Sequence, residues 1–277
     1  MTPDELAQRI AELARDASME MTPGDEALVP ALAAELPPGA VVFVAHTPRA
    51  TVEDVVRTSL RVQACGLAAC PHIVARRIDA PEALQAACER LGAAGIGRAL
   101  VVAGDDGVTA GDYASTLDLL KTGLLTRHGI TRVGVAAHPE GHRAIGQTVL
   151  WRALHDKQLH ARRAGMDLFV VTQFGFDPAA IVGWEQCLPG HGISLPIHVG
   201  MAGPASLSQL IAYAMQCGVG ASIRGALRSM NAMRNVAGLA TSPDQMLARI
   251  ATARWLRAVA AGRFEINSEG DAFTVQS

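Results

Sequence analysis

The chain has 277 residues, of which 49% are hydrophobic and 18% are charged, a composition that is typical of a compact globular protein and excludes a disordered one. Its 24 basic and 26 acidic residues give a formal net charge of −2, so no electrostatic attraction to nucleic acid or to an anionic membrane is expected. We therefore expect a small-molecule partner, with no nucleic acid and no membrane. A homo-oligomer is compatible with this composition.

The cysteines and the N-terminus indicate the compartment. Five cysteines are present, an odd number without a C-x-x-C pair, which argues against a disulfide framework. Residues 1–16 alternate charged and apolar residues at helical spacing and lack the apolar core of an export signal. Nowhere does an apolar run reach the roughly 18 residues of a membrane span. We therefore expect a cytoplasmic protein.

Short apolar runs alternate with longer helical patterns along the chain, which indicates repeated βα units and a parallel sheet. The alternation predicts an α/β fold, a (β/α)8 TIM barrel forming a single domain over residues 1–277. An open doubly wound sheet would produce the same local pattern. The eight predicted strands span residues 17–22, 41–46, 70–76, 98–104, 132–138, 166–173, 195–201 and 263–267.

The segments between the predicted strands carry helix signals. In TVEDVVRTSLRVQACG, Thr51 is placed to cap a helix and Gly66 to end one. The stretch 218–262 is longer than an ordinary βα spacing, so we expect a helical insertion before the last strand. The tail after Asn267 is polar and is expected to be peripheral.

Side chains available for chemistry in a barrel lie at the carboxyl ends of the strands and in the loops that follow. Glu20 stands out because it lies between Met19 and Met21, where desolvation would raise the pKa of its carboxyl group and make it a proton donor near neutral pH. Alternation alone would equally allow it to face solvent or an ion pair. The full strand-end set is Glu20, His46, Asp105, Asp106, His138, Glu140, His142, Gln173, Asp177 and Asn267.

Three of these loops invite a more specific interpretation. His138 and His142 have a spacing that binds metals on a helix, but the intervening Pro-Glu-Gly disfavours a helix, so no metal site is expected. The Gly-Asp turn that contains Asp105 fits a ligand-binding loop and equally a helix cap. Gln173 offers an amide donor and acceptor to a heterocycle or to backbone, and Phe176 is either core or a flat wall for a planar ring.

The strand-end motifs, taken in order, resemble those of bacterial methylenetetrahydrofolate reductases over most of the chain. The motifs are SMEMTP at 18–23, CPHIVAR at 70–76, AGDD at 103–106, VAAHPEGH at 135–142 and MDLFVVTQFGFD at 166–177. The combination of the first-strand Glu, the PEGH loop and the TQFGFD strand end is the specific part of the resemblance.

The resemblance implies roles for several residues of this chain. Glu20 would be the general acid that assists opening of the methylene bridge and protonates folate N5. Asp105 would lie near the flavin and the pterin, and Gln173 would contact the folate beside the hydride step. His142 matches a histidine near the cofactor. The implied catalytic residues are thus Glu20, Asp105 and Gln173, the cofactor-binding residues His46, Asp105, His138 and His142, and the substrate-binding residues Gln173, Phe176 and Asp105.

Several flavin contacts of the family are altered. Flavin-containing members have Thr-Tyr where this chain has Ala45 and His46, an Arg where it has Ala103, and a Tyr where it has His138. Loss of the Arg removes a bidentate anchor for phosphate. The resemblance therefore leaves open a version in which FAD relays hydride and one in which NAD(P)H delivers hydride directly.

The implied reaction is the interconversion of 5,10-methylenetetrahydrofolate and 5-methyltetrahydrofolate with NAD(P)H. Its direction stays open between the reductive sense of methionine biosynthesis and the oxidative sense of demethylation. The alternative class is a non-redox folate-binding barrel, or a tetrahydrofolate-linked methyltransferase or demethylation partner. Consumption of NADH or NADPH in the presence of folate would separate the two classes.

Overall fold

The computed structural model describes residues 2–104, 109–142, 144–175, 177–201 and 247–252, and the backbone of residues 273–276. The chain divides into two compact units, each assembled from segments that are separated in sequence. Unit 1 comprises Met1–Ala17, Ala137–Ala153 and Thr172–Ser277, and unit 2 comprises Ser18–Ala136 and Leu154–Val171.

Unit 2 is built on parallel strands that follow one another in chain order. A doubly wound sheet reverses its strand order at a switch point, and the strands of unit 2 do not. The described strands are β1 (Met19–Met21), β2 (Val41–Val44), β3 (Ala68–Val74), β4 (Arg98–Val102), β5 (Arg132–Ala137) and β6 (Asp167–Thr172), the last residues of β5 and β6 belonging to unit 1.

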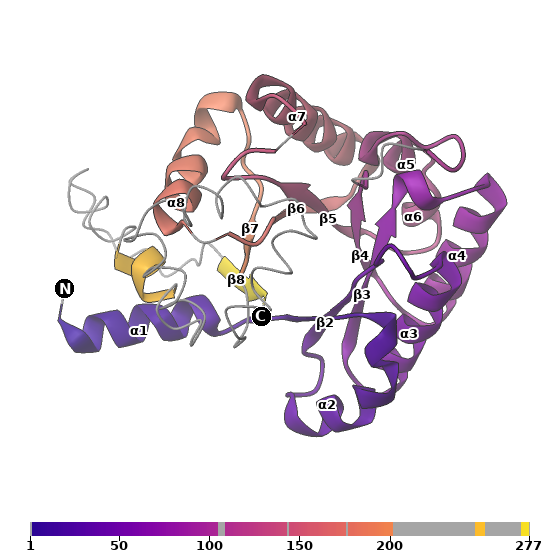
Figure 1. The fold of residues 1–277 in the computed structure, drawn as a ribbon, viewed down its shortest axis with the longest axis horizontal. Helices are drawn as coiled ribbons and strands as arrows, with labels where there is room; N and C mark the ends of the chain where they lie inside the picture. The colour runs from indigo at the N-terminus through magenta and orange to yellow at the C-terminus, as the bar shows by residue number, and fades with distance from the viewer. Residues whose placement is uncertain are drawn as a thin grey trace. The chain divides into compact units, whose positions relative to one another are not determined.

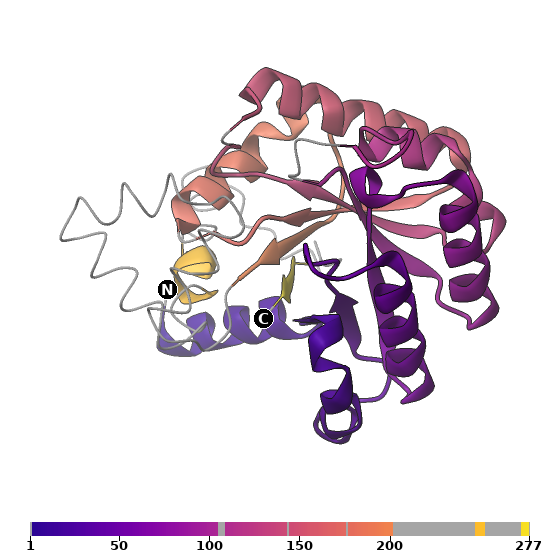
Figure 2. The same cartoon turned by 45° about the vertical axis from the view of Figure 1, so that its right-hand side comes forward.

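Helices alternate with these strands. In both views α3 (Val52–Ala64) and α4 (Pro81–Ala93) lie side by side along the strands of unit 2 (Figure 1, Figure 2). The remaining elements of unit 2 are η1 (Pro23–Leu28), α2 (Val29–Glu35), η2 (Ala75–Arg77), α5 (Thr116–Lys121) and α6 (Leu124–Arg127), together with the end of α7 (Gln147–Ala164).

Helix α3 forms where the sequence predicts it. The Thr51 side chain accepts a hydrogen bond from Asp54 N, and Asp54 reciprocates by accepting from Thr51 N, so the capping box satisfies two backbone donors. Past its end Gly66 adopts a φ of +82°, the left-handed conformation that glycine tolerates best. Val55, Val56 and Val62 turn the apolar side of the helix into the core.

One face of the unit 2 sheet is a cluster of strand side chains without helix residues, which we call the strand face. It consists of Phe43, Cys70, Leu100, Phe169 and Val171. A Cβ on Gly134 of β5 would lie 2.8 Å from the Phe169 ring and 3.0 Å from Leu100 Cδ1, so glycine makes room for that ring. The strand face is therefore a closely packed apolar floor.

Unit 1 contains α1 (Pro3–Ala14), α8 (Pro178–Cys187), η3 (Pro189–His191), β7 (Ile197–Gly200) and β8 (Phe273–Gln276), and the beginning of α7. Strands β7 and β8 pair in parallel. Trp151 of α7 stacks on Trp184 of α8 with ring centroids 5.6 Å apart, and on His191 at 4.3 Å. These aromatic contacts tie the start of α7 to α8 and η3.

The predicted strands agree with the described ones at seven places, and the eighth differs. The predicted strand 263–267 lies outside the described residues, whereas β8 lies in the tail that we expected to be peripheral. Most of the predicted insertion 218–262 is also outside them, and residues 247–252 are helical. The α/β fold with parallel strands is confirmed, and barrel closure, a single domain and the insertion stay predictions.

Among the described residues, no helix is both long enough and apolar enough to span a membrane.

Candidate active site

Two titratable side chains meet on the strand face of unit 2. Glu20 of β1 is in register with Phe43 of β2, and neighbours in register on parallel strands point to the same side of a sheet. His72 of β3 packs its ring edge-on against the Phe43 ring, with centroids 5.9 Å apart. Its Nε2 lies 3.6 Å from Glu20 Oε2. The apolar floor thus carries an acid and an imidazole side by side.

Burial shifts the pKa of each group in the direction that favours its neutral form. Burial raises the pKa of Glu20 to about 7 and lowers the pKa of His72 to about 4. The Glu20 side chain is 45% exposed, so water solvates part of its carboxyl group and weakens the effect of burial on its pKa. His72 is only 13% exposed. The Glu20 carboxyl group therefore keeps its proton to a higher pH than an ordinary glutamate does.

Two arginines fasten the loops beyond the strand ends of unit 2. Arg76 donates through Nη1 to Gly104 O and through Nε to Ala114 O, both at 3.0 Å, and holds the loop that follows β4. Arg77 donates to the carbonyl oxygen of His46, in the loop that follows β2. Sequence reasoning did not single these arginines out, because nothing in their spacing indicates that they bind loop carbonyls.

His46 is buried, with 8% of its surface exposed, and its Nε2 lies 3.1 Å from Ala50 O. This contact closes the loop between β2 and α3. Asp105, which the resemblance places at the flavin and the pterin, lies outside the described residues.

The loop after β5 belongs to unit 1 and is held by its glutamate. Glu140 Oε1 accepts a hydrogen bond from Asp177 N, 3.1 Å away, and a Cβ on Gly175 would collide with the same oxygen. The rings of His138 and His142 meet edge to face, with centroids 4.9 Å apart. Glu140 therefore anchors the loop that follows β5 to the start of α8.

Gln173 follows β6 in the same unit. Its backbone N–H donates to Ala137 O at 2.7 Å, and its side-chain Oε1 accepts from Phe174 N at 3.1 Å. The side-chain oxygen is thus engaged with the backbone, which was the plainer of its two predicted roles. Phe176 lies outside the described residues.

The predicted residues therefore fall into two groups, with Glu20 and His46 in unit 2 and His138, His142 and Gln173 in unit 1. Sequence reasoning missed the residue that lies beside the predicted acid, His72. A signal was available, because CPHIV places one imidazole in an otherwise apolar strand. A buried polar side chain in such a strand needs a reason.

The fold and this site define an α/β protein with parallel strands. Its first strand carries a glutamic acid whose raised pKa favours the protonated form. The family model of methylenetetrahydrofolate reductase matches residues 35–232, more than half of the chain. The chain belongs to the methylenetetrahydrofolate reductase family. Glu20 precedes the matched segment, so its role rests on the first-strand motif and on the geometry above.

Solved structures with a similar course of the chain have low sequence identity. A protein from Burkholderia cenocepacia J2315 described as a lyase/mutase is 15% identical, with a TM-score of 0.46, and the match covers 95% of this chain and 91% of that one. Oxaloacetate acetylhydrolase in complex with 3,3-difluorooxalacetate is 11% identical, with a TM-score of 0.45, over 95% and 98% of the two chains.

Proposed function

We propose that the protein transfers hydride between NAD(P)H and the one-carbon unit of a tetrahydrofolate, interconverting the 5,10-methylene and 5-methyl forms. Family membership supports a folate-related enzyme. The observation that carries the specific proposal is Glu20, an accessible carboxyl group whose pKa is raised to about 7 on an apolar face. Opening of the methylene bridge needs an acid at the folate nitrogen, and a carboxyl group that is protonated near neutral pH supplies one.

Each step of this reaction asks something different of the chain. Glu20 donates its proton to the folate as the bridge opens: the bond between the carbon and N10 breaks, and the carbon, which stays on N5, then accepts hydride. The nicotinamide supplies that hydride when it is bound. In the reverse direction the Glu20 carboxylate takes the proton back.

We propose that the protein works without a bound flavin, and we derive no step through one. His46, which the resemblance places at the flavin, is buried against Ala50 O, and its carbonyl is bound by Arg77. Ala103 offers no cation to a pyrophosphate, and the Arg76 guanidinium nearby is committed to two backbone carbonyls. We therefore propose direct transfer from the nicotinamide.

The proposal is tested with the purified full-length protein. Absorbance is recorded before and after incubation with FAD and desalting, and NADH or NADPH is then mixed with 5,10-methylenetetrahydrofolate. We expect no retained flavin absorbance and folate-dependent loss of the reduced nicotinamide. Retained flavin would overturn direct transfer. The absence of folate-dependent turnover with either nicotinamide would overturn the oxidoreductase and favour a non-redox folate protein.

A further inference from the structure

One nitrogen of the imidazole beside Glu20 is buried without a hydrogen-bond partner among the described residues. His72 Nε2 is buried and, among the described residues, accepts and donates no hydrogen bond. A buried imidazole nitrogen without a partner costs free energy, and the ring could have avoided that cost by facing solvent. Glu20 Oε2 lies 3.6 Å from this nitrogen, a few tenths of an ångström beyond hydrogen-bonding range. A shift of a few tenths of an ångström would form a hydrogen bond between the two atoms once Glu20 is ionised.

The surroundings of His72 limit what else its nitrogen could serve. Phe43 packs against the ring from β2, and Leu100 is the register partner on β4. Cys70, on the same face of β3, has a thiol whose pKa is raised by burial, so it is neutral. Arg76, at the end of β3, directs its guanidinium to Gly104 and Ala114. Among the described groups of these strands, Glu20 is the one that changes charge near neutral pH.

We propose that His72 is a positioning residue that donates a hydrogen bond from Nε2–H to Glu20 when the carboxyl group has given up its proton. The inference rests on the proposed role of Glu20 as the acid. Before transfer, both groups are neutral and lie at the observed separation. After transfer, the electron pair of the former O–H bond stays on the carboxylate, and the charged oxygen attracts the N–H dipole. Charge-assisted hydrogen bonds are shorter and stronger than neutral ones.

The proton count of this cycle is simple. One proton leaves Glu20 for the substrate nitrogen, none leaves His72, and one proton from solvent restores the acid. Solvent has a route to Glu20 because 45% of its side chain is exposed. The imidazole therefore limits how far burial can raise the acid's pKa, since it stabilises the ionised form.

The direct test is a titration of Glu20 by carbon NMR, with labelled glutamate carboxyl groups and the Glu20→Gln variant to identify the signal. His72→Leu removes the donor, and we expect the pKa of Glu20 to rise by about one pH unit, as for the loss of one hydrogen bond to a carboxylate. His72→Gln keeps an N–H near the same place and should leave the pKa close to its wild-type value. His128→Leu, at the C-cap of α6, is the control histidine.

An unchanged Glu20 pKa in His72→Leu, or an equal rise in His72→Gln, would overturn the proposal. If His72→Leu fails to fold, His72→Met, which is unbranched, replaces it in the same titration. This titration needs no turnover, so it stands even if the proposed reaction fails. With turnover, the pH at which folate reduction declines should move upward in His72→Leu and return in His72→Gln. A decline at the same pH in all three proteins would contradict the role of His72 in catalysis.

Discussion

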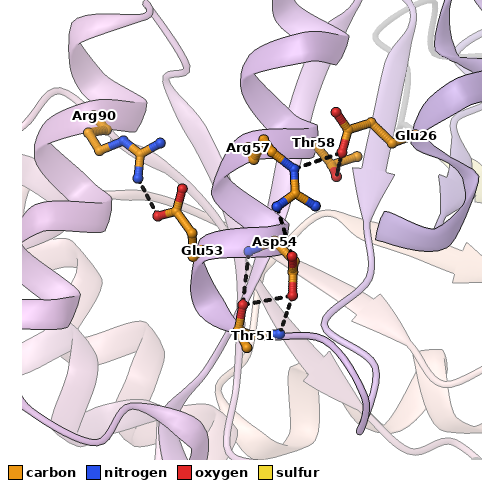
Figure 3. Close-up of polar contacts among 7 residues, drawn as sticks. All are labelled: Glu26, Thr51, Glu53, Asp54, Arg57, Thr58 and Arg90. Atoms are coloured by element: carbon orange, nitrogen blue, oxygen red, sulfur yellow. Dashed lines mark hydrogen bonds and ion pairs between the residues drawn. The ribbon is translucent and has the colours of Figure 1, made fainter.

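Unit 2 carries two sets of titratable side chains that differ in their neighbours. Around α3, every carboxyl group shown in Figure 3 has a partner: Arg57 pairs with Glu26 at 3.0 Å and with Asp54 at 2.9 Å, and Arg90 pairs with Glu53. On the strand face, Glu20 meets a neutral imidazole. Carboxyl groups of unit 2 are thus found beside arginines around α3 and beside an imidazole on the strand face.

The pKa values record this contrast. The pKa of Asp54 is lowered to about 2 by the hydrogen bond from the Thr51 backbone, then by the Thr51 hydroxyl and by Arg57. The pKa of Glu20 is raised to about 7 because burial disfavours its charge. Hydrogen bonds and a cation around Asp54 favour its ionised form at a helix start, whereas burial favours the protonated form of Glu20. Neighbours, and not residue type, decide which carboxyl group is suited to catalysis.

The largest expected effect comes from replacing the carboxyl group of Glu20. Glu20→Gln keeps the shape and removes the transferable proton, so we expect folate-dependent turnover to fall by roughly 10²- to 10⁴-fold, the usual contribution of a general acid. The measurement is the rate of nicotinamide oxidation with methylenetetrahydrofolate, with circular dichroism to confirm folding. Glu26→Gln is the matched control on the paired side and should retain turnover. Turnover that survives in Glu20→Gln would remove the acid assignment.

The contrast also bears on what the sequence could predict. The cap at Thr51 was predicted, because a cap depends on residues a few positions apart; the reciprocal bond from Thr51 N to Asp54 is seen only in the structure. Glu20 was readable as an acid in an apolar strand end. His72 was not linked to it, because their meeting depends on the pairing of β1, β2 and β3 and not on sequence distance. Strand β8 was missed because its tail shows no apolar run strong enough to mark a strand.

The second effect concerns helix α3, whose carboxyl groups pair with arginines, and it changes stability alone. Thr51→Ala removes the side-chain acceptor for Asp54 N at the start of α3, and loss of such a cap lowers the free energy of unfolding by about 1 kcal/mol. Urea unfolding followed by circular dichroism measures this change. Turnover per folded molecule should not change, because the helix start lies outside the Glu20–His72 pair. Thr131→Ala, an exposed threonine before β5, is the control and should unfold at nearly the wild-type urea concentration.

The smallest effect separates the two carboxyl groups by the sign of their pH dependence. The folded-state pKa of Glu20 is raised, so the native protein binds more protons than the unfolded chain between the ordinary Glu pKa of 4.5 and about 7, and its contribution to stability declines as pH rises through that window. Asp54 behaves in the opposite sense: its lowered pKa gives stability that is present above the ordinary Asp value of 3.8 and is lost as pH falls toward about 2.

Variants reveal these slopes better than the wild-type curve, because His72, with its lowered pKa, contributes stability that is lost as pH falls from 6.5 toward about 4 and so opposes Glu20 in an overlapping window. We expect Glu20→Gln to gain stability relative to wild type as pH rises from 4.5 to about 7 and to keep that gain above it. We expect Asp54→Asn to lose stability relative to wild type at every pH above the ordinary Asp range. The Glu20 difference should be small, since solvent reaches its carboxyl group. Unfolding midpoints measured across pH test both signs. A Glu20→Gln protein that is less stable than wild type above neutrality would show that neighbours on the strand face stabilise the ionised carboxylate. Glu20 would then resemble the carboxyl groups around α3.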